Sequence, residues 1–240
     1  MACLFVSDLH LDASAPQATD QFIALLRQQA RSASVVYILG DLFEVWVGDD
    51  DADPERERVC AALRAFTQTG VPVFALQGNR DFLLGDGFVA RTGCRMLPDP
   101  VVADLHGTPV LLTHGDLLCT GDHAYQELRS TVRAAAWQRR FLALPLPERL
   151  LLADAARSGS RSHTQRARPQ IMDVDAAAVD ALFVATGVSL MIHGHTHRPG
   201  VHQSTVAGRA VTRGGLDGWY AQGNRMWWEH GRIELRDLPR

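Results

Sequence analysis

The chain has 240 residues, 46% of them hydrophobic, and a formal net charge of −3. This length and composition can bury the core of one domain, with or without an insertion. The small net charge favours neither a nucleic-acid partner, which we do not expect, nor an acidic tail. The four cysteines form no CxxC pair, which argues against a disulfide framework or a cysteine zinc site and is typical of a cytoplasmic protein. The N-terminus predicts no signal peptide, and no apolar stretch reaches the roughly 18 residues of a membrane span.

Five short apolar runs, rich in branched residues, each end in a polar cluster. They are Leu4–Val6, Val35–Leu39, Val71–Leu76, Val110–Leu112 and Leu190–Ile192. Continuous rather than alternating apolar runs are typical of strands that are covered on both faces. Helices are predicted between the first three runs, around Asp20–Ser32 and Glu55–Thr69, so the fold class is predicted to be α/β.

The segment from about Tyr125 to Ala167 interrupts this pattern. Its leucines and aromatic residues alternate with arginines, and Pro145 and Pro147 divide it, which predicts two or more inserted amphipathic helices. The run Ser158-Gly159-Ser160 predicts a loop, and Val201–Leu238 predicts short strands and turns. We therefore expect a single domain over residues 1–240, with a helical lid inserted at about residues 123–168.

The polar residues that follow the apolar runs are candidate metal ligands. They are Asp8, His10, Asp41, Asn79, His114, His195 and His197. Because ligand sites in open α/β sheets lie beyond the carboxyl ends of the strands, these side chains are expected to converge. Aspartate, histidine and asparagine without thiolate suit Mn²⁺, Fe²⁺, Co²⁺, Ni²⁺ or Zn²⁺ better than Ca²⁺. Two ions sharing one carboxylate would account for seven ligands, and such pairs, about 3.5–4 Å apart, activate water against phosphoryl groups.

Other polar residues have less support as metal ligands. His106, His123, His163, His202 and His230 are expected to be surface or core residues, and His193 needs no ligand role. The run Asp49-Asp50-Asp51 could form a third acidic site, but a solvated loop is the preferred interpretation.

The motifs Asp8-Leu9-His10, Gly40-Asp41, Gly78-Asn79, His114 and Gly194-His195-Thr196-His197 occur in the order typical of the calcineurin-like metallophosphoesterases, which the chain resembles. The resemblance implies an αββα sandwich with an inserted helical lid. It also implies that Asp8, His10, Asp41 and His197 hold one metal ion, and that Asp41, Asn79, His114 and His195 hold the other. Asp41 would then bridge the two ions.

Arg80 stands where most of that superfamily has histidine. Arginine cannot donate a proton at neutral pH but can stabilise phosphoryl charge, which favours a pyrophosphate bond over a simple ester. The run Gly78-Asn79-Arg80-Asp81-Phe82-Leu83-Leu84-Gly85 is similar to that of the UDP-2,3-diacylglucosamine pyrophosphohydrolases of lipid A biosynthesis. This resemblance implies hydrolysis at the α-phosphorus to UMP and 2,3-diacylglucosamine 1-phosphate (lipid X), with Mn²⁺ as the preferred metal.

The same resemblance implies which residues act on the substrate. The implied catalytic residues are Asp41, Asn79, Arg80 and His195. The implied substrate contacts are Asn79, Arg80, Asp122, Ser160 and His195, together with Thr164 and Ala167, which stand where the family commonly has asparagine and lysine.

The inserted segment has two interpretations on sequence alone. Its apolar residues could form a groove for acyl chains and its arginines could dock at an anionic membrane, or it could be an ordinary lid packed on the core. The family resemblance favours the groove, and with it a peripheral location on the cytoplasmic face of the inner membrane of a Gram-negative bacterium. The alternatives are another dimetal phosphoesterase, acting on nucleotides or phosphoproteins, and a scaffold without catalytic activity.

Overall fold

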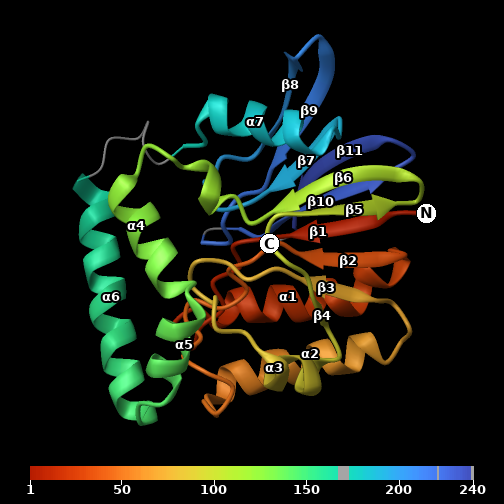
Figure 1. Ribbon diagram of the computed structural model, residues 1–240. Helices are drawn as coiled ribbons and strands as arrows, with labels where there is room; N and C mark the ends of the chain where they lie inside the picture. The colour runs from red at the N-terminus through yellow and green to blue at the C-terminus, as the bar shows by residue number, and fades with distance from the viewer. Residues whose placement is uncertain (167–172, 221, 239–240) are drawn as a thin grey trace.

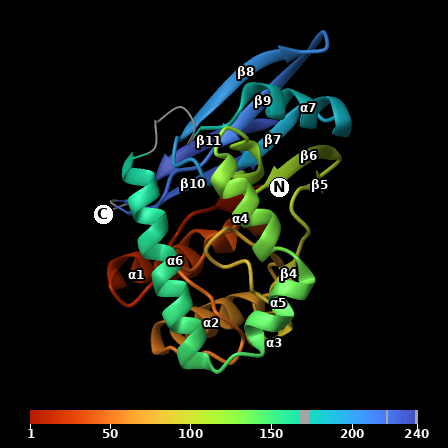
Figure 2. The same ribbon diagram turned by 60° about the vertical axis from the view of Figure 1, so that its left-hand side comes forward.

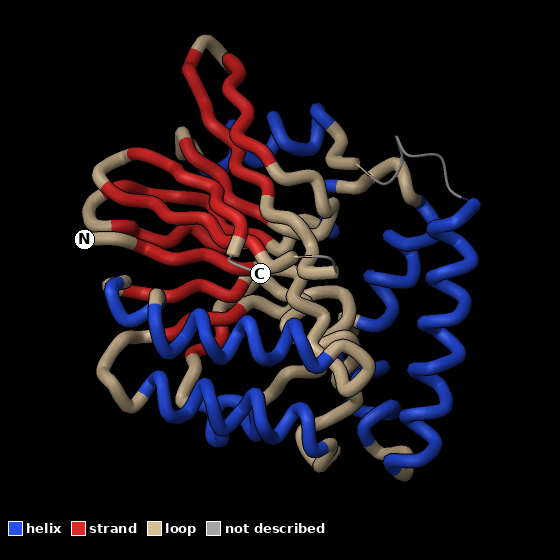
Figure 3. The backbone as a smooth tube through the Cα atoms, turned by 180° about the vertical axis from the view of Figure 1, so that it is seen from behind, coloured by secondary structure: helices blue, strands red, loops and turns tan. Residues whose placement is uncertain are grey.

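The computed structural model describes residues 1–166, 173–220 and 222–238, with residues 161–166 described by their backbone alone. Two β-sheets pack face to face between outer layers of helices (Figure 1). This arrangement confirms the αββα sandwich that the resemblance implies. The edges and layers of the two sheets are also visible from behind (Figure 3).

The first sheet has six strands in the order β11-β10-β1-β2-β3-β4. Their bounds are Cys3–Val6 for β1, Val35–Ile38 for β2, Val73–Ala75 for β3, Arg95–Met96 for β4, Asn224–Glu229 for β10 and Arg232–Asp237 for β11. Strands β1 to β4 pair in parallel, whereas β10 pairs antiparallel with β1. The carboxyl ends of β1, β2 and β3 therefore meet at one edge of the sandwich.

The second sheet has five strands in the order β5-β6-β7-β9-β8. Their bounds are Val101–Leu105 for β5, Thr108–Thr113 for β6, Leu190–His193 for β7, Gly200–Val206 for β8 and Arg209–Gly215 for β9. Strand β7 lies between two parallel neighbours, β6 and β9. The prediction of short strands toward the C-terminus is confirmed by β8 to β11.

Three helices cover the outer face of the first sheet, and α7 (Ala176–Thr186) covers that of the second (Figure 1). The three are α1 (Pro16–Gln28), α2 (Pro54–Thr67) and α3 (Asp86–Thr92). Proline opens α1 and α2, and the Asp53 carboxylate accepts the first free backbone N–H groups of α2. The predicted helices at residues 20–32 and 55–69 are thus confirmed, with α1 beginning earlier and a short 3₁₀ turn (Ala30–Ser32) following it.

The central strands are buried on both faces, as their continuous apolar runs predict. Phe5 of β1 faces the second sheet. Its ring stacks on that of Tyr37 from the neighbouring strand β2, at a centroid distance of 5.1 Å. Its neighbours Leu4 and Val6 face the helical layer and pack with Phe22. Alternate side chains of a strand point to opposite faces, so one short strand serves both cores and its end is held rigidly.

The inserted segment forms three helices at the end of the sandwich: α4 (His123–Val132), α5 (Ala135–Leu142) and α6 (Leu146–Arg166) (Figures 1 and 2). The prediction of inserted helices divided near Pro145 is confirmed. The predicted loop at Ser158-Gly159-Ser160 is wrong, because these residues lie within α6. A single glycine costs a helix only about 1 kcal/mol relative to alanine, and an ion pair from Arg157 to Glu44 (3.3 Å) holds this turn against the core.

The acidic run Asp49–Asp51 lies in a loop, as predicted, but only Asp50 is exposed to solvent. Asp49 accepts hydrogen bonds from Trp46 Nε1 (3.2 Å) and Gly87 N (2.7 Å), and Asp51 is buried in an ion pair with Arg56. Asp50 pairs with Arg149 of α6. Asp49 and Asp51 can be withdrawn from solvent because N–H groups or a buried guanidinium group within the protein pair with their carboxylates.

No helix in the described ranges, residues 1–166, 173–220 and 222–238, has both the length and the apolar composition to cross a membrane. The helical lid therefore contains no membrane span among its described residues.

Candidate active site

The seven candidate ligands lie together at the carboxyl ends of β1, β2, β3, β6 and β7. A chain of short distances connects them. Asp8 Oδ1 lies 3.4 Å from His197 Nε2, and Asp8 Oδ2 accepts from the backbone N–H of His195 at 2.8 Å. Asn79 Oδ1 lies 2.9 Å from His114 Nε2 and 2.8 Å from His195 Nδ1. Both sheets thus contribute to one site.

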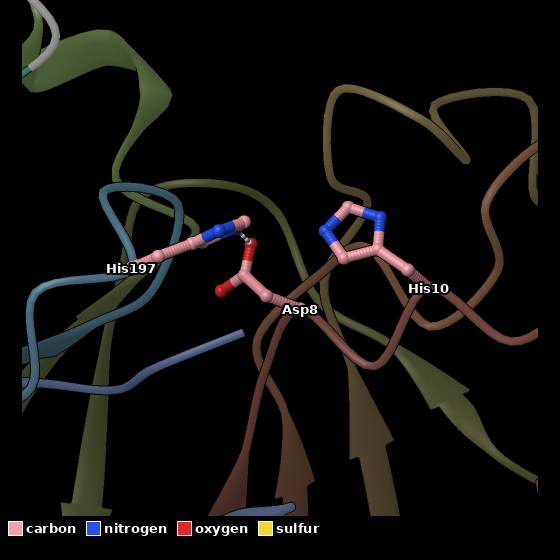
Figure 4. Close-up of side chains that lie close together, drawn as sticks. All are labelled: Asp8, His10 and His197. Carbon is pink, nitrogen blue, oxygen red and sulfur yellow. Dashed lines mark ion pairs between the residues drawn. The ribbon is translucent and has the colours of Figure 1, made fainter. Parts of the chain in front are cut away.

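The ligand atoms form two groups that share a residue. In the first cluster, atoms of Asp8, His10 and His197 all lie within 4.8 Å of one another (Figure 4). In the second cluster, the same limit holds for Asp8, Asp41 and His114, and Asn79 joins it through His114. This spacing suits two neighbouring cations.

The carboxylate of Asp41 lies between the two clusters. Its Oδ2 is 3.8 Å from His10 Nε2, and its Oδ1 is 3.8 Å from His114 Nε2. One oxygen therefore faces each cluster, which is the arrangement that a bridging carboxylate requires. Asp8 is also shared between the clusters, a second connection that the sequence motifs do not imply.

Five of the seven residues adopt the left-handed backbone conformation, which is uncommon outside glycine. Their φ angles are 55° for Asp8, 50° for His10, 50° for Asp41, 68° for His195 and 50° for His197. Strained residues of this kind persist only where the surroundings hold them, and they gather at functional sites. Here the backbone hydrogen bonds from Asp8 N to Gly40 O (3.1 Å) and from His10 N to Asp41 O (3.0 Å) hold the loops.

Two motif glycines allow the loops to approach closely. A Cβ at Gly78 would lie 2.1 Å from Asp41 Oδ1, and a Cβ at Gly194 would lie 2.0 Å from Ser7 Oγ. Any side chain at either position would displace a candidate ligand loop.

Asp81 organises two of these loops, a role that its place in the motif alone did not reveal. Its buried carboxylate accepts from the backbone N–H groups of Gly78 (2.7 Å), Leu42 (2.8 Å) and Asp41 (3.3 Å). Burial, followed by the charge of Asp41, raises the pKa of Asp81 to about 6. The ends of β2 and β3 are thereby tied together.

Two histidines are oriented by hydrogen bonds from the nitrogen that faces away from the clusters. His10 Nδ1 donates to Glu44 Oε2 (2.9 Å), and His114 Nδ1 donates to the carbonyl of Leu39 (2.9 Å). Both acceptors fix the tautomer, so Nε2 of each ring is left for a cation. This role of Glu44 was not predicted from the sequence, although the residue lies three positions after Asp41.

Buried atoms without hydrogen-bond partners test whether the site suits metal ions. Asp8 Oδ1 and His10 Nε2 are two such atoms, and both point into the first cluster. Buried unpaired polar atoms are costly, so their presence here points to a missing partner. Both atoms are electron-pair donors, and the donor set of this site therefore fits divalent cations.

The electrostatic field of the site, set by its carboxylates, also favours positive charge. Burial lowers the pKa of His114, but the carboxylates of Asp41 and Asp8 outweigh it and raise that pKa to about 9. Burial and the neighbouring His114 instead lower the pKa of His195 to about 4. The excess of carboxylate that would hold a proton on His114 is the same excess that would attract a divalent cation.

A cavity of about 650 Å³ opens beside the clusters, between the lid and the core loops. Its polar lining includes Glu44, Asn79, Arg80, Tyr125 and Ser160, together with the arginines Arg129, Arg133, Arg140 and Arg157. The apolar part is lined by aromatic and aliphatic side chains from both the lid and the core, including Trp46, Phe82, Trp137, Phe141, Leu144 and Leu152. An apolar volume next to the candidate metal clusters suits a substrate with a hydrocarbon portion.

The remaining predicted substrate contacts differ in where they lie relative to the cavity. Ser160 lines the cavity. Asp122 is buried and accepts from Tyr125 N (3.0 Å) as the N-cap of α4. Thr164 lies within the span of α6, but its side chain is outside the described part of the chain. Ala167 lies outside the described residues altogether.

Asp116 connects the lid to the site, a third role that the sequence motifs did not reveal. Its buried carboxylate accepts from Tyr125 OH (2.5 Å) and Arg129 Nε (2.8 Å), both on α4. The Tyr125 ring in turn stacks on His195, with 5.8 Å between centroids. Arg133, further along the lid, donates to the carbonyl of Gly78 at 3.0 Å. The one local signal is that Asp116 follows the candidate ligand His114 by two residues.

His193 has no part in either cluster. Its Nδ1 donates to the carbonyl of Gly194 (2.8 Å), and its Nε2 accepts from Arg213 (2.8 Å). Both ring nitrogens are therefore satisfied by the protein, in agreement with the expectation that this histidine needs no ligand role.

The fold and the paired clusters define a metallophosphoesterase, and comparison with known proteins agrees. A family model described as calcineurin-like phosphoesterase matches residues 1–199, and the chain belongs to this family. Its curated relatives include the UDP-2,3-diacylglucosamine hydrolase of Stenotrophomonas maltophilia strain K279a, 48% identical over 247 residues that cover 100% of both chains. The UDP-2,3-diacylglucosamine hydrolase of Xanthomonas campestris pv. campestris strain ATCC 33913 is 47% identical over 245 residues and 99% of both chains.

Among solved structures, a novel archaeal phosphodiesterase superposes with a TM-score of 0.53. The superposition covers 99% of this chain and 100% of that one, at 11% sequence identity. At this identity the likeness establishes the fold and nothing finer.

Proposed function

We propose that the protein hydrolyses the pyrophosphate bond of UDP-2,3-diacylglucosamine at the α-phosphorus. The products are UMP and 2,3-diacylglucosamine 1-phosphate, an intermediate of lipid A biosynthesis. The observation that carries the proposal is the apolar cavity that opens onto the candidate metal clusters at Asn79 and Arg80. Relatives that carry the name of this hydrolase and match the whole chain support it.

The proposed cofactors are two divalent ions, Mn²⁺ by preference. Asp8, His10, Asp41 and His197 would hold one ion, and Asp41, Asn79, His114 and His195 the other. When bound, such ions lower the pKa of water and offset negative charge on a phosphoryl group. The two orphaned donor atoms and the carboxylate excess of the site support this assignment.

Arg80 is proposed to stabilise the phosphoryl oxygens. Its backbone N–H donates to Asp41 Oδ1 (2.7 Å), which fixes the residue beside the clusters, and it lines the cavity. A guanidinium group keeps its charge at neutral pH and matches the geometry of phosphate oxygens. A phosphate leaving group needs little help from a proton, so arginine suits this reaction better than it suits the hydrolysis of an alkyl ester.

His195 and Asn79 are proposed to act with Arg80. The low pKa of His195 keeps its ring neutral, so it can serve as a ligand or a donor beside the phosphoryl group. Asp122, Ser160, Thr164 and Ala167 are the further proposed head-group positions. Of these, Ser160 has the most direct support because it lines the cavity.

The acyl chains are proposed to occupy the apolar part of the cavity. Phe82 of the core and Trp137 and Phe141 of α5 form an aromatic wall there, with centroids 6.0 Å and 4.9 Å apart for the two successive pairs. This wall joins the proposed lid to the core. We propose accordingly that residues 1–240 form one domain whose lid spans about residues 123–168.

The lid is also proposed to dock on the cytoplasmic face of the inner membrane of a Gram-negative bacterium. Leu150, Leu151 and Leu152 are exposed at the surface of α6, and Leu151 is 72% exposed. Exposed Arg139 and Arg140 lie on the adjacent helix α5. Apolar side chains beside arginines suit an anionic lipid surface, which is where an acylated substrate resides.

Parallel assays of two substrates test this function. The Mn²⁺-loaded protein is incubated with UDP-2,3-diacylglucosamine and, separately, with diadenosine tetraphosphate. We expect kcat/KM to be at least about a hundredfold higher for the acylated substrate, because only it can fill the apolar cavity. Equal or preferred turnover of the dinucleotide would instead support a nucleotide phosphoesterase, and no turnover of either would support a scaffold.

A further inference from the structure

Tyr220 covers the first cluster outside the lid cavity. Its ring stacks on His10, with 5.0 Å between centroids and 15° between planes, and it lies 5.2 Å from the ring of His197. The residue is nevertheless 69% exposed. Within residues 1–166, 173–220 and 222–238, it is the one aromatic residue among the exposed large hydrophobic ones.

The segment that carries Tyr220 is fixed against the candidate ligands. Trp219 N donates to the carbonyl of Asp8 (3.0 Å), and Leu216 N donates to the carbonyl of His193 (2.9 Å). A Cβ at Gly218 would lie 2.9 Å from His197 Nδ1, so the backbone runs directly along that ring. These contacts place the segment at the first cluster without any involvement of the lid.

Trp219 anchors the segment from the inside. Its side chain is buried and packs edge-on against Phe22 at 6.2 Å between centroids. The neighbouring Tyr220 is therefore displayed at the surface by a rigid support. One face of its ring lies on His10, and its exposure leaves the other face open to a ligand.

The shape of the proposed substrate requires a second binding region. The lid cavity lies on the side of Asn79 and Arg80, and Asp8, His10, His197 and Tyr220 do not line it. If the acyl chains fill that cavity and the α-phosphorus lies at the clusters, then the nucleoside must extend from the clusters in another direction. The side next to His10 and His197 is the one that presents an open aromatic ring.

We infer that Tyr220 is a stacking platform for the nucleobase of the UMP half of the substrate. This inference rests on the proposed function and extends it to the nucleotide half, which the lid does not accommodate. Stacking on an aromatic side chain uses the π-face that every base has. Tyr220 therefore contributes affinity for a nucleotide over a plain sugar phosphate, and it does not select uracil among bases.

Two variants separate stacking from the other effects of the side chain. Tyr220→Leu keeps an apolar side chain but removes the aromatic ring, and Tyr220→Phe keeps the ring but removes the hydroxyl. The probes are UMP and ribose 5-phosphate, which share the phosphate and the sugar and differ by the base. Calorimetric titration of the Mn²⁺-loaded full chain gives the ratio of the two dissociation constants for each variant.

The expected ratio is about tenfold in favour of UMP for the original chain and for Tyr220→Phe, and within about twofold for Tyr220→Leu, from the usual strength of base stacking. An unchanged ratio in Tyr220→Leu would overturn the inference. So would equal binding of both probes by the original chain, or a parallel loss of both in Tyr220→Leu, which would mean that the ring only supports His10. Turnover of UDP-2,3-diacylglucosamine, measured separately, reports on the proposed function, so the two can fail independently.

Discussion

Glu44 accepts a hydrogen bond from His10 Nδ1 at 2.9 Å and pairs with Arg157 of the lid at 3.3 Å. A single carboxylate therefore orients a candidate metal ligand and contacts the helix that encloses the cavity. Although burial opposes it, the hydrogen bond from His10 and the charge of Arg80 keep the pKa of Glu44 below its usual value. Glu44 is thus ionised at neutral pH and can act only as an acceptor.

Replacing Glu44 by Ala should weaken Mn²⁺ binding by about 10- to 100-fold, because the His10 ring loses the partner that fixes its tautomer. Glu44→Gln should lose less Mn²⁺ affinity, since its amide oxygen can still accept the hydrogen bond from His10. The measurement is the Mn²⁺ concentration that gives half-maximal turnover. The same Mn²⁺ requirement in Glu44→Ala and the original chain would mean that His10 needs no such support.

Asp41→Ala should remove bound metal and reduce turnover by at least about a thousandfold, because both clusters lose an oxygen that lies 3.8 Å from a histidine nitrogen. Metal content by elemental analysis and kcat are the two readouts. The matched control is Asp20→Ala, which removes an exposed carboxylate of α1 that belongs to neither cluster and is paired with Arg58. Two retained metal ions in Asp41→Ala would contradict the proposed bridging role.

Arg149→Ala should lower the free energy of unfolding by about 2–3 kcal/mol, because the buried guanidinium group donates to two carbonyls that would lose their partner. These are the carbonyls of Val47 (2.7 Å) and Leu144 (3.0 Å). Urea denaturation provides the measurement. The exposed Arg139→Ala is the control and should change stability by less than about 0.5 kcal/mol. Equal effects of the two variants would show that Arg149 does not anchor the lid.

Replacing Leu150 and Leu151 together by Gln should reduce binding to vesicles that contain anionic phospholipid by roughly tenfold or more, because two exposed apolar side chains would no longer enter the lipid. Cosedimentation with vesicles measures this directly. Val184→Gln, which removes an exposed apolar side chain of α7 remote from the lid, should bind as the original chain does. Unchanged sedimentation of the double variant would rule out docking through α6.

The sequence predicted the strands that carry the site because their runs are apolar throughout and end abruptly. Leu4–Val6 and Leu190–Ile192 are examples, and both are buried strands in the structure. The assignment of β1 and β7 to different sheets could not be read from these runs, since a strand covered on both faces has the same pattern in either sheet. The resemblance supplied that part of the fold.

The convergence of the candidate ligands was also predictable, but the residues that hold them were not. Glu44 acts on His10 and Asp81 on the backbone N–H of Leu42, 34 and 39 residues away in the chain, and Asp116 holds Tyr125 of a different element, α4. Such partners depend on the tertiary structure and produce no periodic pattern in the local sequence. The partial burial of the acidic run at residues 49–51 was not predicted, and its partner Arg149 lies 99 residues away from Asp50. The role of Tyr220 likewise emerges only from its stacking on His10.

The proposed function requires that water attacks the α-phosphorus of UDP-2,3-diacylglucosamine. This can be measured by turnover in ¹⁸O-labelled water, followed by mass spectrometry of both products. We expect one ¹⁸O atom in UMP and none in 2,3-diacylglucosamine 1-phosphate. Label in the lipid product would place the attack on the other phosphorus, and would contradict the proposed arrangement of the nucleotide and the acyl chains around the clusters.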